Sequence, residues 1–305
     1  MDTKTLEELS FYKIREEIGG CCKSPEGKAA LLKRIPLADG DEIALLKEYA
    51  SEWALLLQAS PAVLAPWQEV GSLLHLASAE GAALALEQLY DLMLFARSLQ
   101  QVAEGIAAQK EQLEIPALAA LCATLPLKQA AEAEQAIGRV IDESGQMRDL
   151  PALRAIRAKI AAIHGDIERE MKRFTSDASL LTTVLEANVP AWRADRQVLA
   201  VKASQKTRIQ GIVHEVSQSG QTVYIEPEAV VRKNNELIQE EFHLEQEMRK
   251  ICAEATAVLR PLAEDLRQGL SVMIRLDTSL AAARWGLEKK CVYALPCGRE
   301  APQIG

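Results

Sequence analysis

The sequence holds few residue patterns that could carry catalysis, and each of them is incomplete. His214-Glu215 begins like the zinc-protease motif H-E-x-x-H, but Gln218 stands where the second histidine is needed, and the segment is predicted to end a strand. Gly27-Lys28 lacks both the earlier glycine and the following hydroxyl that a phosphate-binding P-loop requires. The sequence therefore predicts no catalytic residue within this chain.

Small polar residues near His214 are interpreted as structural. Ser217, Ser219 and Gly220 separate two β-branched runs, and no nearby base could activate either serine, so the cluster predicts a turn. His214 itself is interpreted as a buried or turn-capping residue. Asn234 opens the following helical segment, where it is expected to cap the helix or to hydrogen-bond the base of the preceding strands.

The cysteines are expected to be free thiols. They form no CxxC pair and no regular framework, and no histidine lies near the last two to complete a zinc site. We therefore predict no metal site. The six residues are Cys21, Cys22, Cys122, Cys252, Cys291 and Cys297.

A basic excess is concentrated in one short segment of an otherwise acidic chain. The 305 residues carry a formal net charge of −8, whereas residues 191–214 hold five cations against one acid, Asp195, a local charge of +4. The cations are Arg193, Arg196, Lys202, Lys206 and Arg208. Such a local excess suits contact with nucleic-acid phosphates, although from the residues alone an ordinary solvated sheet face is the simpler interpretation. Residues 191–227 hold only Trp192 and Tyr224 as aromatics, which favours backbone contact over base stacking.

The basic segment coincides with the stretch whose pattern is least helical. Residues 193–202, 208–214 and 222–227 form three β-branched runs separated by polar or glycine-containing turns. This pattern predicts a small antiparallel meander whose last two strands form a hairpin. Because so small a sheet is not stable alone, the flanking segments must support it.

Those flanking segments are predicted to be two long helices. Apolar residues recur every three or four positions on both sides of the strands, with Glu241 as the one polar interruption of the second series, in a stripe that leaves the other faces charged. The first stripe comprises Leu153, Ile156, Ile160, Ile163, Ile167, Met171 and Phe174, and the second comprises Leu237, Leu244, Met248, Ile251, Ala255, Val258 and Leu262. We expect two exposed arms, each about 45 Å long, that pair antiparallel, with a kink at Pro261.

The remaining composition favours a mainly α fold. Aromatic residues make up only 4% of the chain, and helical periodicity dominates the first 150 residues, as in the stripe from Leu84 to Ile106. Ser24 followed by Pro25 predicts the start of one of these helices. The first residues, Met1 to Glu8, show neither the basic n-region nor the apolar h-region of a signal peptide, and no run approaches the ~18 apolar residues of a membrane span. We therefore expect a cytoplasmic protein with no membrane partner.

The stretch from Arg208 to Pro227, followed by Asn234-Asn235, resembles the second bacterial MutS family, whose members are MutS paralogues without the mismatch-reading domain. Thr5-Leu6-Glu7, Lys13-Ile14 and Gly27 support the resemblance, which covers nearly all of the chain. Within the motif, the residues expected to have structural roles are His214, Ser217, Ser219, Gly220, Glu226, Pro227, Asn234 and Asn235.

The resemblance implies a helical core bundle with a long antiparallel two-helix lever that carries a small β clamp at its tip. It places the helical core in residues 1–150, the first lever helix in 151–185 and the clamp in 186–229. The second lever helix and its return to the core then occupy 230–287. Residues 288–305 form a tail, without regular structure from Pro296, that leads toward an ATPase domain expected beyond this chain.

The resemblance also implies a function. The chain would be the core, lever and clamp of a MutS-like ATPase that binds DNA, including branched recombination intermediates, or ribosomal RNA without sequence specificity. Family roles are the suppression of homologous recombination and the rescue of collided ribosomes, and many members carry an endonuclease domain. ATP and Mg²⁺ are expected only in the absent ATPase domain, which also makes the homodimer, so this chain alone should be monomeric or weakly associated. The alternative is a structural coiled-coil scaffold whose head binds a protein partner.

Overall fold

The computed structural model describes residues 3–59, 63–176, 184, 191–193 and 196–294 of the chain. They form two compact units, called here unit 1 (Met1–Arg148 with Cys252–Gly305) and unit 2 (Asp149–Ile251). Among the described residues the chain is mainly helical with one four-stranded antiparallel sheet, which confirms the prediction of a mainly α fold with a small antiparallel sheet.

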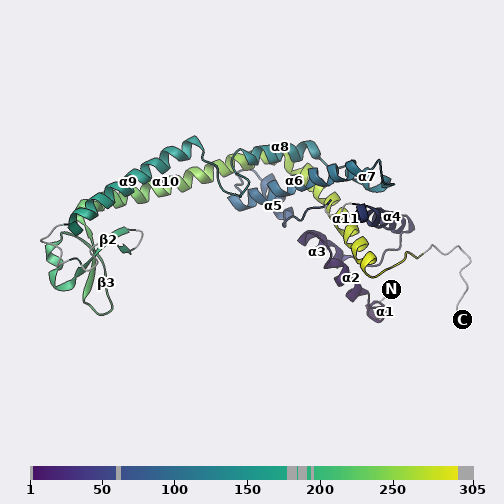
Figure 1. Cartoon of the computed structure of the whole chain (residues 1–305), viewed down its shortest axis with the longest axis horizontal. Coiled ribbons are helices and arrows are strands. Elements are labelled where there is room, and N and C mark those ends of the chain that lie inside the picture. Colours follow the sequence, from purple (N-terminus) through teal and green to yellow (C-terminus); the bar gives the residue numbers. More distant parts are fainter. Residues whose placement is uncertain (1–2, 60–62, 177–183, 185–190, 194–195, 295–305) are drawn as a thin grey trace, which may run out of the picture. The chain divides into compact units, whose positions relative to one another are not determined.

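Unit 1 is built from helices around α11 (Figure 1). Helix α11 contacts α2, α3, α4 and α5, and the core includes the fully buried side chains of Trp53, Leu56 and Phe95. The helices are α1 (Thr3–Glu8), α2 (Phe11–Gly19), α3 (Pro25–Lys33), α4 (Gly40–Ala59), α5 (Gly71–Ser78), α6 (Leu86–Gln109), α7 (Pro116–Cys122), α8 (Leu127–Gly138) and α11 (Ala263–Glu288).

One buried acid of unit 1, Asp277, fixes the start of helix α3. The Ser24 side chain accepts a hydrogen bond from the Gly27 amide, with Pro25 in the first helical turn, which confirms the predicted helix start. Asp277 of α11 accepts hydrogen bonds from the amides of Lys23 and Ser24, at 2.7 and 3.0 Å, and from the Ser24 hydroxyl at 2.7 Å. A Cβ atom on Gly27 would lie 2.1 Å from Asp277 Oδ2, so only glycine fits here.

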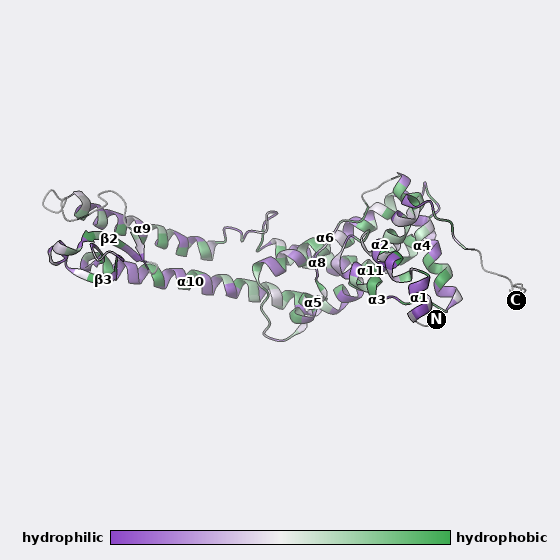
Figure 2. Ribbon diagram, turned by 90° about the horizontal axis from the view of Figure 1, so that it is seen from below, coloured by the Kyte–Doolittle hydropathy of each residue, from purple (hydrophilic) through white to green (hydrophobic). Residues whose placement is uncertain are grey.

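Unit 2 pairs two helices, α9 (Pro151–Ser176) and the first part of α10 (Glu228–Leu259). Lys159 pairs with Glu240 at 2.7 Å, and seven residues later in α9 Asp166 pairs with Lys233, seven residues earlier in α10, at 3.0 Å. The two helices therefore run antiparallel, and the two ion pairs lie one heptad apart along each helix. Figure 2 shows hydrophobic residues interleaved with hydrophilic ones along both helices.

The sheet of unit 2 packs its apolar face against this helix pair. The strands are β1 (Ala191–Arg193), β2 (Arg196–Lys202), β3 (Gly211–Val216) and β4 (Thr222–Pro227), with the 3-10 helix η1 (Ala203–Arg208) between β2 and β3. Buried side chains from four elements form one cluster: Ile163, Ile167 and Met171 of α9, Leu199 and Val201 of β2, Val223 and Ile225 of β4, and Val230 and Leu237 of α10. The predicted apolar seam of the first arm thus becomes the support for the sheet.

The strand order corrects one prediction. The expected hairpin between the last two strands is confirmed, but the order β1-β2-β4-β3 shows that the meander is wrong, because β4 lies between β2 and β3. The reason is burial. Strand β4 offers Val223 and Ile225 to the cluster, whereas β3 leaves Ile212 and Val213 about half exposed and occupies the edge.

Two further expectations concern the second arm. At Pro261 the short 3-10 helix η2 (Arg260–Leu262) joins α10 to α11, since proline supplies no amide hydrogen for an α-helical bond. Val258 is 53% exposed, so its assignment to the apolar stripe is wrong. The predicted boundary between residues 185 and 186, Asp195, Cys297 and the tail from Pro296 lie outside the described residues.

Candidate nucleic-acid interface

A buried carboxylate anchors the end of the sheet nearest α10. The side chain of Glu226, in β4, has no exposed surface, and Arg196 of β2 donates from Nη1 to its Oε1 and Oε2 at 2.8 and 3.1 Å. Nη2 of Arg196 donates to Asn235 Oδ1 at 2.5 Å. Arg196 therefore joins the sheet to α10 through charge-assisted hydrogen bonds.

Two more residues of the sequence motif converge on Glu226. His214 Nε2 lies 2.7 Å from Glu226 Oε2, and Asn234 donates from Nδ2 to Glu226 Oε1 at 2.8 Å and to the Gln197 carbonyl at 3.3 Å. Burial acts to raise the pKa of Glu226, but the hydrogen bonds from Asn234, His214 and Arg196 outweigh it and hold the pKa below its ordinary value. The negatively charged carboxylate of Glu226 in β4 thus links this strand to β2, β3 and α10. The pyrrolidine of Pro227 follows it directly, at the last position of β4.

Arg193 is also held by partners within the sheet. It pairs with Glu215 Oε2 at 2.5 Å, and its guanidinium carbon lies 3.9 Å from the centre of the Tyr224 ring. The structure therefore gives protein partners to both arginines of the basic segment that lie on β1 and β2.

The other three cations lie at the end of β2 and on the connection from β2 to β3. Lys202 ends β2 opposite Thr222, while Lys206 and Arg208 belong to η1. All three are exposed, and residues 202–208 include no acid. The Ala203 amide donates to the Gln221 carbonyl at 2.9 Å, which holds η1 beside the turn between β3 and β4. Residues 202–208 are called the cationic segment below.

The turn beside the cationic segment is closed by the serines of the motif. Ser217 Oγ accepts from the Thr222 amide at 3.0 Å, and the Ser217 amide donates to the Thr222 carbonyl at 2.8 Å. The hydroxyls of Ser217 and Ser219 lie 3.3 Å apart, and Gly220 has a φ of 69°, in the left-handed region that glycine adopts readily. These contacts position the loop and offer no base to activate a serine.

Sequence reasoning missed the internal pairing of Arg193 and Arg196. Glu215 and Glu226 were visible as acids on neighbouring strands, but their partners depend on the strand order and on the irregularity between Val213 and Glu215 in the β3–β4 register. No signal within a single strand reports either feature.

The glycine-lysine pair in α3 does not fit a nucleotide. The Gly27 amide already donates to Ser24, and the Asp277 carboxylate occupies the start of the helix, where it would repel a phosphate. Within the described part of the chain, no group of three His, Cys, Asp or Glu residues is arranged to hold a metal ion. None of the described helices is both long and apolar enough to cross a membrane.

By its fold the chain is a mainly helical protein in which an antiparallel helix pair supports a small sheet with a cationic connection between two of its strands. Curated proteins named Endonuclease MutS2 are similar to nearly all of it. The one from Lactococcus lactis subsp. cremoris (strain MG1363) is 31% identical over 288 residues, which are 91% of this chain and 35% of the relative. The one from Pelotomaculum thermopropionicum is 29% identical over 294 residues, 93% of this chain and 36% of the relative.

Over the region that it spans, the chain is similar to members of the second bacterial MutS family. It spans little more than a third of the length of these relatives. No family model matches the chain.

Proposed function

We propose that unit 2 binds the phosphate backbone of nucleic acid, without reading bases, through Lys202, Lys206 and Arg208. The supporting observation is that the basic residues of this region fall into two groups with different surroundings. Arg193 and Arg196 pair with Glu215 and Glu226 of the sheet, whereas Lys202, Lys206 and Arg208 are exposed on the connection from β2 to β3, where residues 202–208 include no acid. Exposed cations on a fixed support can approach phosphates, and such contacts carry no sequence information.

Within this proposal α9 and α10 act as the lever and the sheet as the clamp of a longer MutS-type protein. The relatives are named endonucleases, and the chain would hold DNA, including branched DNA, or ribosomal RNA for the remainder of that protein. ATP and Mg²⁺, the homodimer contact, the family roles in recombination and ribosome rescue, and the cytoplasmic location belong to the same proposal. A backbone contact of this kind suits either nucleic acid.

The test compares two triple variants for binding to a B-form DNA duplex across a salt series. K202Q/K206Q/R208Q should weaken binding and reduce the slope of log affinity against log salt by about 2.7, which is about 0.9 for each of three phosphate contacts. The matched control, K33Q/K110Q/R139Q, removes three exposed cations of the same types from unit 1 and should leave both quantities unchanged. Equal affinity and slope in the folded clamp variant would reject the proposed surface.

A second candidate function, a head that binds protein, rests on the edge strand β3. Ile212, Val213 and Val216 are 49%, 50% and 53% exposed, which is unusual for large apolar side chains on an edge. Salt-insensitive binding to a protein partner that is lost in I212S/V216S, with no measurable affinity for DNA or RNA, would favour this function over the first.

A further inference from the structure

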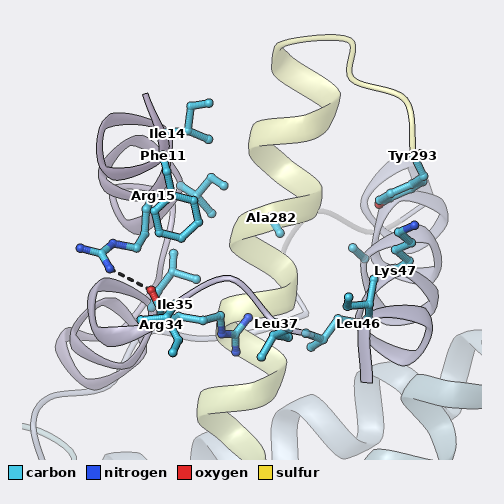
Figure 3. A pocket seen from close by; sticks show the side chains of 14 residues that line it. Phe11, Ile14, Arg15, Arg34, Ile35, Leu37, Leu46, Lys47, Ala282 and Tyr293 are labelled. Carbon is cyan, nitrogen blue, oxygen red and sulfur yellow. Dashed lines mark hydrogen bonds between the residues drawn. The ribbon is translucent and has the colours of Figure 1, made fainter. Parts of the chain in front are cut away.

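Unit 1 contains a pocket of about 350 Å³ that nucleic-acid binding does not explain. Helix α2, the connection from α3 to α4, α4 and α11 surround it, as Figure 3 shows. Its walls are almost entirely apolar, from residues such as Phe11, Ile14, Leu37, Leu46 and Tyr293. The pocket lies in the size range of small-molecule sites in proteins.

The charged residues that line the pocket all have the same sign. Arg15, Arg34 and Lys47 line it, and no aspartate or glutamate does. Lys47 donates from Nζ to the Ala294 carbonyl at 2.7 Å. An all-cationic lining is notable in a chain whose formal net charge is −8.

Arg34 has unused hydrogen-bonding capacity at the pocket. Its backbone carbonyl accepts from Arg15 Nη1 at 2.8 Å, while its own guanidinium, which Figure 3 shows extending across α11 toward Leu37, makes no hydrogen bond or ion pair with any residue that the structure describes. Burial, with the charge of Arg275 adding to it, lowers the pKa of Arg34, and Glu42 acts in the opposite direction. An incoming anion would offset the cost of this half-buried cation.

Arg15 contributes a second unsatisfied donor. Its Nε is buried and has no hydrogen-bond partner among the described residues, although Nη1 is occupied by the Arg34 carbonyl. Its guanidinium carbon lies 5.0 Å from the centre of the Tyr12 ring and 5.6 Å from that of Phe11, which holds the side chain against α2. Arg15 is thus held in place beside α2, and the Arg34 guanidinium is the one that extends along the apolar space.

The apolar walls are themselves partly open to water. Ile35 is 69% exposed, Tyr293 is 49% exposed and Ile14 is 39% exposed. Covering such side chains with an apolar group is favourable because it removes their surface from water. The pocket therefore offers an apolar contact and an anion contact side by side.

We propose that this pocket binds a small amphipathic acid, with an apolar body that fills the space between α2, α4 and α11 and one carboxylate that pairs with Arg34. At ~30 Å³ for each water-sized group, the cavity admits about a dozen non-hydrogen atoms. This site is independent of the cationic segment, since every residue that lines it belongs to unit 1.

Titration calorimetry on the 305-residue chain tests the proposal with three probes of equal chain length: octanoate, 1-octanol and octylammonium. We expect saturable binding of octanoate at one site, at least tenfold weaker binding of octanol, and none of octylammonium. R34Q should weaken octanoate at least tenfold and leave octanol unchanged, whereas A282L, which narrows the pocket at α11, should weaken both.

The matched control is K33Q, which removes the neighbouring exposed cation that does not line the pocket, and it should bind octanoate as the parent chain does. Circular dichroism and melting temperature establish that each variant is folded. The proposal is overturned if the folded parent chain shows no saturable binding of octanoate, if octylammonium binds as well, or if folded R34Q binds octanoate with unchanged affinity.

Discussion

Arg196 reaches across from β2 to the fully buried carboxylate of Glu226 in β4 and donates two hydrogen bonds to it, at 2.8 and 3.1 Å. A residue whose sequence neighbourhood suggests a solvent-facing cation is therefore part of the internal structure. Unit 2 therefore contains two kinds of basic residue: those that stabilise the sheet, as Arg196 does, and those that are exposed on it.

Replacing Arg196 with methionine should destabilise unit 2 strongly. The change leaves the Glu226 carboxylate buried without its guanidinium partner, and breaking a buried pair in this way costs about 3–5 kcal/mol of unfolding free energy. Lys202→Gln, at the other end of the same strand, should leave the unfolding free energy nearly unchanged. Urea unfolding followed by circular dichroism measures both. A similar, small effect for the two variants would show that His214 and Asn234 alone can satisfy Glu226.

The stability of unit 2 should depend on acid pH through Glu226. Its pKa in the folded state lies below its ordinary value, so the stability it contributes is present above the unfolded pKa, about 4.3, and is lost as the pH falls through the folded pKa. The unfolding free energies of the parent chain and of E226Q should differ by a constant amount between about pH 7 and pH 5. This difference should shrink below about pH 4.3 in urea titrations. A difference that stays constant to about pH 3 would contradict the assignment.

Gly211→Ala should disrupt the pairing of β3 with β4. A Cβ atom at this position would lie 2.0 Å from the Glu226 carbonyl oxygen, and backbone cannot move aside as a flexible side chain can. We expect a loss of about 1–3 kcal/mol of unfolding free energy. The control is Gly165→Ala in α9, where no atom lies within 4 Å, and it should stabilise the helix by about 1 kcal/mol. Equal changes in the unfolding free energy of the two variants would show that the sheet accommodates the methyl group at position 211.

Gly27→Ala should destabilise unit 1 through Asp277. The added Cβ would lie 2.1 Å from Asp277 Oδ2, so the carboxylate would have to leave the amides of Lys23 and Ser24. Each buried donor left without a partner costs about 1–3 kcal/mol. Thermal unfolding compares this variant with Gly138→Ala, which meets no atom within 4 Å and should not lower the melting temperature. An unchanged melting temperature for Gly27→Ala would mean that Asp277 has another position available.

Periodic features of the structure were predictable from the sequence because they depend on neighbours along one helix or one turn. The seam of Ile163, Ile167 and Met171 follows from spacing alone, and the β3–β4 hairpin follows from the turn at Gly220. The strand order was not predictable from the sequence, because it depends on which strand packs its apolar face against two helices that are distant in sequence.

The sequence predicts which residues of the sheet region are charged, but not which of them form ion pairs. The sequence identifies five cations within residues 191–214, but which of them are paired depends on the register across β2, β3 and β4. The pocket in unit 1 could not be anticipated either, since Arg15, Lys47 and Ala282 come together only when α2, α4 and α11 pack.

The last residue of β4, Pro227, is followed immediately by the first residue of α10, Glu228, whose amide donates to the Gln210 carbonyl at 3.0 Å. Strand β4 and helix α10 consequently follow each other without a loop, and the hydrogen bond between Glu226 and Asn234 joins the two sides of the junction. Local opening of the strand must then carry the first turns of the helix with it. In amide hydrogen exchange, β4 and the start of α10 should exchange together as a single cooperative unit, with a common opening free energy.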